Sequence, residues 1–172
     1  MEDAMLKKLD EVHCDLKSMF NNCRWNGVNI DFTPPKMMRL WTSYGGIKAC
    51  LHKIYPISAD SIEKEKPFLH PHPWPCAIKV LKGAYEMEVG HSTTLSPPLI
   101  SMKFVMSADS SYEMLYKDIW HSVNPINDDP IYSIMLIGKK WDREMPKKHT
   151  SSPRILNELE KECLINEFDQ LL

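Results

Sequence analysis

The sequence has no dense run of lysine or arginine and no long apolar run. Its 21 Lys and Arg and 23 Asp and Glu give a formal net charge of -2, so nothing in the charge suggests a nucleic-acid partner. Apolar stretches such as residues 134–137 are far shorter than the ~20 residues of a membrane-spanning helix. The first residues are acidic, where a secretory signal is basic. We therefore expect a cytoplasmic protein without a nucleic-acid or membrane partner.

Regularly spaced cysteines are also lacking. The five cysteines show no C-x-x-C spacing and are Cys14, Cys23, Cys50, Cys76 and Cys163. An odd count without a regular framework argues against disulfides and against a structural zinc site. Reduced and mostly buried thiols are the expectation.

Internal repeats are absent, and the apolar periodicity divides the chain into three parts. Apolar residues at steps of three and four predict amphipathic helices over residues 4–20 and from Ser152-Pro153 to the end. A short helix over residues 36–42 is also expected. The predicted organisation is a single domain over residues 1–172. It has three segments: an N-terminal helical segment (1–45), a β-barrel (46–142) and a C-terminal helix (152–172).

The middle of the chain predicts β-strands. Short segments rich in Ile, Val, Tyr and Met are separated by turn signals such as Lys82-Gly83. The expected strands are residues 47–55, 76–81, 85–89, 99–106, 112–116, 120–123 and 131–138. This pattern is typical of an all-β sandwich or barrel, whose outside or open ends the terminal helices would cover.

A His-x-His pair is the most informative motif. His70 and His72 project from the same face of an extended strand, and the prolines around them stiffen the segment. The distant His121 ends another apolar strand. Neutral imidazoles are common ligands of first-row transition metals. These residues predict a metal site, and the alternative is that each is an ordinary hydrogen-bonded histidine.

The spacing resembles that of the cupin superfamily. His70-x-His72, three residues, Cys76, six residues and a glycine is similar to the first cupin motif, which has Glu at the Cys76 position. The segment around His121 is similar to the second motif. The resemblance covers residues 66–141. It implies an all-β core that is a double-stranded β-helix (a cupin jelly-roll barrel), with flanking N- and C-terminal α-helices.

The set of three histidines without the usual Glu resembles cysteine-dioxygenase-like cupins, which hold ferrous iron. The resemblance implies a metal ligand set of His70, His72 and His121. Cys76 is then either a fourth ligand or pocket thiol, or a small core residue. A divalent metal ion is the implied cofactor, with Fe(II) favoured and Zn, Ni or Mn as alternatives.

These features favour a metal-dependent oxidoreductase, a non-haem iron-dependent dioxygenase acting on a small polar acid, thiol or diketone. In cysteine dioxygenase a basic residue on an early strand binds the substrate carboxylate. Lys48 or His52 is the candidate here, because both lie on one face of the expected strand 47–55. Tyr85 and Tyr112 are further candidates to line the substrate cavity.

Two other functions remain open from the sequence. One is a zinc- or nickel-dependent isomerase or hydrolase, with Glu86 or Tyr112 as acid or base if they face inward. The other is a non-catalytic cupin that binds a small ligand. The sequence identifies no specific catalytic residue. The apolar stripes of the terminal helices are either intramolecular cover or the surface of a homodimer.

Overall fold

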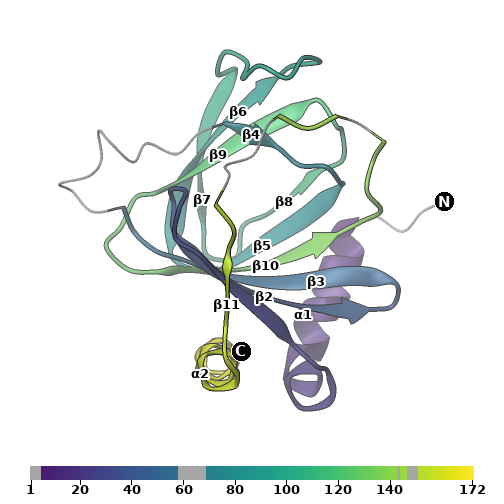
Figure 1. Cartoon of the computed structure of the whole chain (residues 1–172), viewed down its shortest axis with the longest axis vertical. Helices are drawn as coiled ribbons and strands as arrows, with labels where there is room; N and C mark the ends of the chain where they lie inside the picture. The colour runs from purple at the N-terminus through teal and green to yellow at the C-terminus, as the bar shows by residue number, and fades with distance from the viewer. Residues whose placement is uncertain (1–4, 58–68, 143, 147–150) are drawn as a thin grey trace.

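The computed structural model describes residues 5–57, 69–142, 144–146 and 151–172, and it consists of two antiparallel β-sheets with a helix near each end (Figure 1). Neither of the two helices in this part of the chain is long and apolar enough to cross a membrane. The elements are, in chain order, α1 (Met5–Asn22), β1 (Asn26–Ile30), β2 (Met37–Tyr44), β3 (Ile47–Ile54), β4 (His70–Pro71), β5 (Cys76–Lys82), β6 (Ala84–His91), β7 (Met102–Ser107), β8 (Ser111–Met114), β9 (Ile119–Pro125), β10 (Ile131–Ile137), β11 (Arg154–Ile155) and α2 (Glu158–Asp169).

The strand order is that of a jelly roll. The larger sheet has the order β11-β1-β2-β3-β10-β5-β8, and the smaller has the order β4-β9-β6-β7. If β3 to β10 are counted as strands one to eight, these orders contain 1-8-3-6 and 2-7-4-5, the arrangement of two Greek keys in a jelly roll. The predicted fold class, an all-β jelly-roll core with flanking helices, is confirmed.

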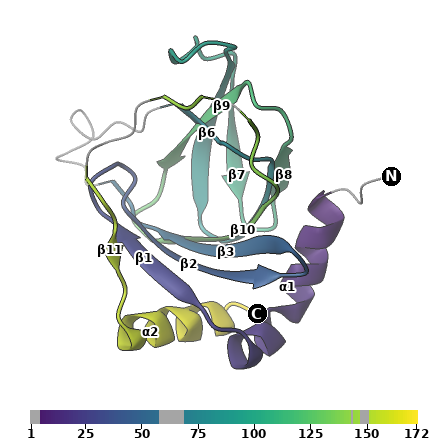
Figure 2. The same cartoon turned by 45° about the vertical axis from the view of Figure 1, so that its right-hand side comes forward.

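Successive residues along each strand of the larger sheet point to opposite faces, and each face has its own core. Leu51, Ala77 and Ile134 belong to the core beneath α1 and α2. Cys50 and Ile78 belong to a second core on the opposite face. Figure 2 shows both helices on the side of this sheet away from β6 and β7. The helices therefore cover the outside of the jelly roll and leave its interior to strand residues.

The N-terminal segment contains strands where the sequence predicts a helix. Residues 37–44 form β2, which pairs with β1 and β3, and the expected helix over residues 36–42 is wrong. Leu40 packs beneath the helices, whereas Trp41 packs against the core on the other face. This alternation has a period of two, but the run Met-Met-Arg-Leu-Trp is too short for periodicity to distinguish a strand from a helix.

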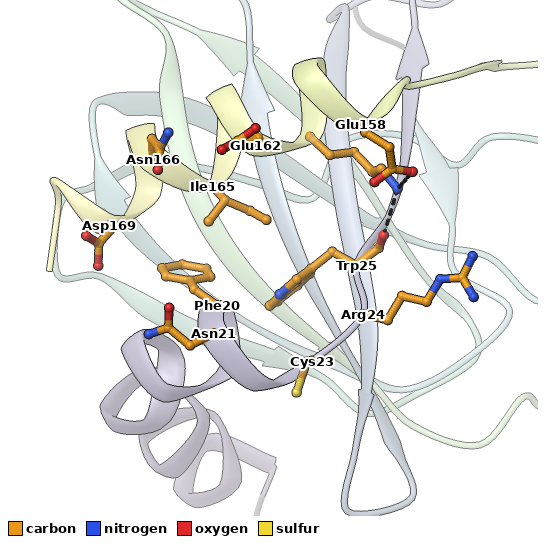
Figure 3. Close-up of a pocket in the computed structure, with 11 residues that line it drawn as sticks. Phe20, Asn21, Cys23, Arg24, Trp25, Glu158, Glu162, Ile165, Asn166 and Asp169 are labelled. Atoms are coloured by element: carbon orange, nitrogen blue, oxygen red, sulfur yellow. Dashed lines mark hydrogen bonds and ion pairs between the residues drawn. The ribbon is translucent and has the colours of Figure 1, made fainter.

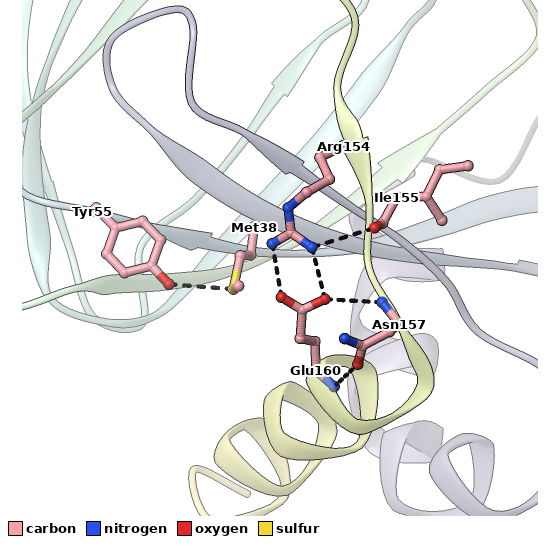
Figure 4. Close-up of polar contacts among 6 residues, drawn as sticks. All are labelled: Met38, Tyr55, Arg154, Ile155, Asn157 and Glu160. Atoms are coloured by element: carbon pink, nitrogen blue, oxygen red, sulfur yellow. Dashed lines mark hydrogen bonds and ion pairs between the residues drawn. The ribbon is translucent and has the colours of Figure 1, made fainter.

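The C-terminal helix begins later than expected, at Glu158 rather than after Ser152-Pro153. Asn157 is its N-cap and forms a capping box with Glu160. Figure 4 shows Arg154 donating to both carboxylate oxygens of Glu160, at 2.9 and 2.7 Å. These bonds, with that from the Asn157 N–H, lower the pKa of Glu160 to about 2. Residues 154–155 form β11 instead of helix because they pair with β1.

The cap gives a first prediction on stability. We expect Asn157→Ala to lower the free energy of unfolding by about 1 kcal/mol, because the Glu160 N–H loses its side-chain acceptor. Urea denaturation of the full chain measures this. The matched control is Asn166→Ala, an exposed asparagine within α2, which is expected to change stability by less than about 0.5 kcal/mol. Equal losses in both variants would contradict the capping role.

Candidate metal centre

The structure brings His70, His72 and His121 together in the smaller sheet. His70 on β4 lies directly opposite His121 on β9, although the two are far apart in sequence. One ring nitrogen from each histidine lies within 4.8 Å of the other two. The Nε2 atoms of His72 and His121 are 2.8 Å apart. The three rings therefore converge on one point, as a shared ion would require.

Prolines hold the two neighbouring histidines in place. Pro71 pairs with Trp120, and the strand that contains it is only two residues long. Proline has no N–H to donate to a ladder, so it is found at strand edges and at strand entries. β4 is therefore a short edge strand, and the rings of His70 and His72 are 5.4 Å apart between centroids.

His121 is buried in its neutral form. The residue is only 4% exposed. Burial and the nearby His70 and His72 lower the pKa of its imidazole well below the ordinary value. The neutral ring is the form that binds a metal ion. Its Nδ1 is buried and has no hydrogen-bond partner among the described residues. Such burial is unfavourable, so the position is costly unless the ring has a further role.

The donor set fits a divalent transition metal. Nitrogens bound at about 2.1 Å to one ion lie roughly 3.0 to 3.4 Å apart, close to the separation of the His72 and His121 nitrogens. All three donors are imidazoles, which suit iron, zinc and nickel. His70, His72 and His121 would hold the ion, with His121 as the buried ligand and the other two half-buried.

Cys76 is not a member of this histidine cluster. It is fully buried on β5 and packs with Cys50 and Met114. Burial raises the pKa of its thiol to about 12, so the thiol is protonated at neutral pH. The structure thus places Cys76 in the core as a neutral thiol.

A half-buried arginine on the inner face of the jelly roll was not anticipated from the sequence. Arg39 Nε donates to His52 Nε2 at 2.8 Å, and burial lowers the pKa of Arg39. Burial and Arg39 also lower the pKa of His52 well below its ordinary value. In the described part of the chain no carboxylate pairs with Arg39. A partly desolvated cation without a carboxylate partner favours an anionic ligand.

Arg39 was missed because residues 37–44 form the strand β2 and not the expected helix. In a helix over residues 36–42 its side chain would have no fixed relation to His52. In β2 it lies directly opposite His52 on β3, and residues directly opposite on an antiparallel pair share one face. Lys48, two residues from Cys50 on the same strand, is exposed.

The two tyrosines singled out from the sequence meet inside the sandwich. The hydroxyl of Tyr85 donates to that of Tyr112 at 3.1 Å. Burial raises the pKa of Tyr85 to about 12 and that of Tyr112 well above its ordinary value. Both are therefore neutral. Glu86 faces the other way, toward Lys103 at 3.5 Å, so the condition under which it would act as an acid or base is not met.

A separate cavity of about 500 Å³ lies between the end of α1 and α2 (Figure 3). Phe20, Trp25 and Ile165 form its apolar part, and Glu162 and Asp169 lie at its rim. Lys161 at one end donates to the backbone oxygen of Trp25. The cavity lies on the helix side of the larger sheet and so is not part of the histidine site.

Comparison with known proteins gives likenesses to solved structures. No family model matches the sequence, and no curated protein matches it. The hydroxypropylphosphonic acid epoxidase from S. wedmorenis shares 9% identity with a TM-score of 0.47, over 65% of this chain and 55% of the epoxidase. This chain thus spans only about half the length of that enzyme. KdgF from Halomonas sp. shares 15% identity with a TM-score of 0.44, over 65% of this chain and 88% of KdgF. The Schizosaccharomyces pombe Cnp3 cupin domain shares 13% identity with a TM-score of 0.44, over 64% of this chain and 65% of that domain. The chain is therefore similar to solved structures that include a cupin domain.

Proposed function

We propose that this protein is a metal-dependent cupin-type oxidoreductase, a non-haem iron dioxygenase whose substrate is a small molecule with an anionic group. The observation that carries the proposal is the convergence of three imidazoles, with no carboxylate of the described residues in the cluster. Three neutral ligands leave the full charge of a divalent ion to interact with substrate. Bound Fe(II) would supply Lewis acidity and one-electron chemistry with dioxygen.

The residues of the chain would position the substrate. Arg39 would bind its anionic end, because the half-buried guanidinium points to the inner face and His52 occupies only its Nε. Tyr85 and Tyr112 form a neutral hydroxyl pair that can donate a hydrogen bond to a bound molecule. Met87 and Val89 on β6 belong to the apolar core of the interior and would exclude water from the reacting groups.

Metal analysis and oxygen uptake test this proposal together. The protein is purified without added metal and assayed for Fe, Zn, Ni and Mn, then stripped and reloaded anaerobically with each ion. Oxygen consumption is measured on a panel of small acids, thiols and diketones. Retained iron and iron-dependent oxygen uptake are expected. Retained zinc with oxygen-independent turnover, or no metal binding, would overturn the proposal.

A zinc- or nickel-dependent isomerase or hydrolase is the second candidate. The Tyr85–Tyr112 pair favours it, because neutral hydroxyls can act as proton donors in such reactions. Activity with zinc under argon, lost in Tyr112→Phe, would support this candidate. Loss of activity under argon, whichever metal is loaded, would exclude it.

The role of Arg39 gives a prediction on kinetics. Arg39→Met is expected to raise KM for the best anionic substrate of the panel by about 10- to 100-fold, since charged hydrogen bonds contribute roughly 1.5–3 kcal/mol. Arg39→Lys should recover part of this loss. Arg24→Met, at an exposed position, is the matched control and should leave KM unchanged.

Stability separates this role from a structural one. Arg39→Met removes a half-buried charge that has no carboxylate partner among the described residues, so thermal unfolding is expected to be unchanged or shifted to higher temperature. A variant that unfolds at lower temperature while KM stays normal would show that Arg39 serves the fold instead.

A further inference from the structure

The two sheets present four edge strands in the described part of the chain, and three of them are short. β4 and β11 have two residues each and β8 has four, and β4 contains Pro71. Short strands and prolines are devices that prevent an edge from pairing with another chain. β7 differs, because it has six residues, no proline and a single charged residue, Lys103.

Apolar side chains on β7 and just before it are exposed. Leu99 is 91% exposed, Met102 is 60% exposed and Val105 is 58% exposed. β7 pairs with β6 on one side, and the sheet ends there among the described residues. A strand edge that has no further partner in the described part of the chain and carries exposed apolar side chains is typical of an interaction site.

We propose that β7 is the surface through which two copies of this chain associate, by antiparallel pairing about a two-fold axis. The pairing would join the two four-stranded sheets into one continuous sheet. A two-fold contact places the same strand on both sides, so it must be self-complementary. This proposal is independent of the function of the histidine site.

The faces of β7 restrict the register. Phe104 and Met106 pack toward the interior of the sandwich, whereas Lys103 faces Glu86 and Glu88 on the outer side. Side chains of residues directly opposite each other lie on the same face. The two-fold axis must therefore lie between the two copies of a single residue, which then faces its own copy. An axis at Lys103 would place two lysines directly opposite each other, which is unfavourable.

An axis at Phe104 gives complementary pairs instead. Phe104 lies opposite its own copy, and Met102 lies opposite Met106, so the inner face pairs apolar residues. On the outer face Lys103 of the second copy lies opposite Val105. Val105 is directly opposite Glu86 on β6, so this register places Lys103 of the second copy in the same row as Glu86.

Glu86 suits this role because its contact within the chain is long. Its carboxylate is 3.5 Å from Lys103, and Lys103 also pairs with Glu88. A second lysine approaching from the partner would therefore meet an incompletely neutralised carboxylate. Charge complementarity thus favours the Phe104 register over the Lys103 register.

Sedimentation velocity of the full chain over a range of concentrations tests the proposal. The 20.0 kDa chain is expected to reach twice its mass reversibly in the micromolar range, because one strand pair and a small patch fall short of the roughly 1,600 Å² of a standard interface. Val105→Lys should weaken dimerisation at least 10-fold, since it opposes Lys103 of the second copy. Val105→Glu should preserve or strengthen it.

The stability of the single chain should change in the opposite direction to dimerisation in these two variants. An effect on folding can therefore be told apart from an effect on association. Within one chain Lys at position 105 faces Glu86 and is favourable, whereas Glu there is repelled by it. Thermal unfolding at low protein concentration reports this. Leu159→Lys, exposed on α2, is the matched control and should leave the mass distribution unchanged. A wild-type chain that is monomeric at all concentrations, or equal effects of Lys and Glu at position 105, would overturn the proposal.

Discussion

His121→Ala is expected to lower the affinity for Fe(II) by at least about 100-fold and to reduce iron-dependent oxygen uptake to the same extent. Removing a group that only orients a metal ligand typically lowers affinity 10- to 100-fold, and His121 is itself proposed as a ligand. It is also the one buried member of the cluster, so solvent cannot readily supply a replacement. Competition with a chromogenic chelator measures the affinity.

The matched control for His121 is His91. It lies at the exposed end of β6 in the same sheet, opposite Ile119, and its replacement by alanine should leave metal affinity unchanged. Because a buried alanine could destabilise the sheet, the half-buried His72→Ala is measured as well, with unfolding followed for each variant. Folded His72→Ala and His121→Ala proteins that bind iron as tightly as His91→Ala would exclude the cluster as a metal site.

Much of the site geometry could be predicted from the sequence because it depends on local rules. His70 and His72 share a face since they are two residues apart in an extended segment, and the neighbouring prolines keep that segment extended. The strand that carries His121 could also be predicted, because His121 ends an apolar segment that precedes a turn. The register that places His70 directly opposite His121 depends on the closing of the whole sandwich, which no local pattern contains.

The errors occur where tertiary contacts outweigh local preference. β2 forms because β1 and β3 pair with it on both sides, and the adjacent prolines masked this by suggesting a helix start at residue 36. The same error hid Arg39. The cap at Asn157 was missed because Ser152-Pro153 has the stronger local signal, although β11 pairs with β1 across that segment.

The metal-free protein is expected to lose stability steeply as the pH falls below about 6.5. Burial lowers the pKa of His52 and of His121 well below the ordinary value in the folded state. In the unfolded chain both recover a pKa of about 6.5, so below that pH the unfolded state binds more protons than the folded state. The stability contribution is therefore complete above about 6.5 and decreases as the pH falls toward the folded-state pKa values.

The size of the effect follows from proton linkage. Between pH 5 and 6.5 each histidine contributes a mean slope of about 1.1 kcal/mol per pH unit, which approaches the limit of about 1.4 at the acidic end, and the two together give about 2.2 kcal/mol per pH unit. Urea denaturation in the presence of EDTA between pH 5 and 6.5 measures this slope, above the range in which ordinary carboxylates titrate. His13 on α1 also has a lowered pKa through burial, so the wild-type slope alone does not assign the effect.

Single and double variants make that assignment. His52→Gln and His121→Gln should each reduce the mean slope by about 1.1 kcal/mol per pH unit, and the double variant should lose both contributions while His13 remains. His91→Gln, at an exposed site, should keep the wild-type slope. If the double variant loses stability with falling pH as steeply as wild type, then His52 and His121 are not held neutral by burial. The neutral, metal-competent state of the buried ring would then have no support.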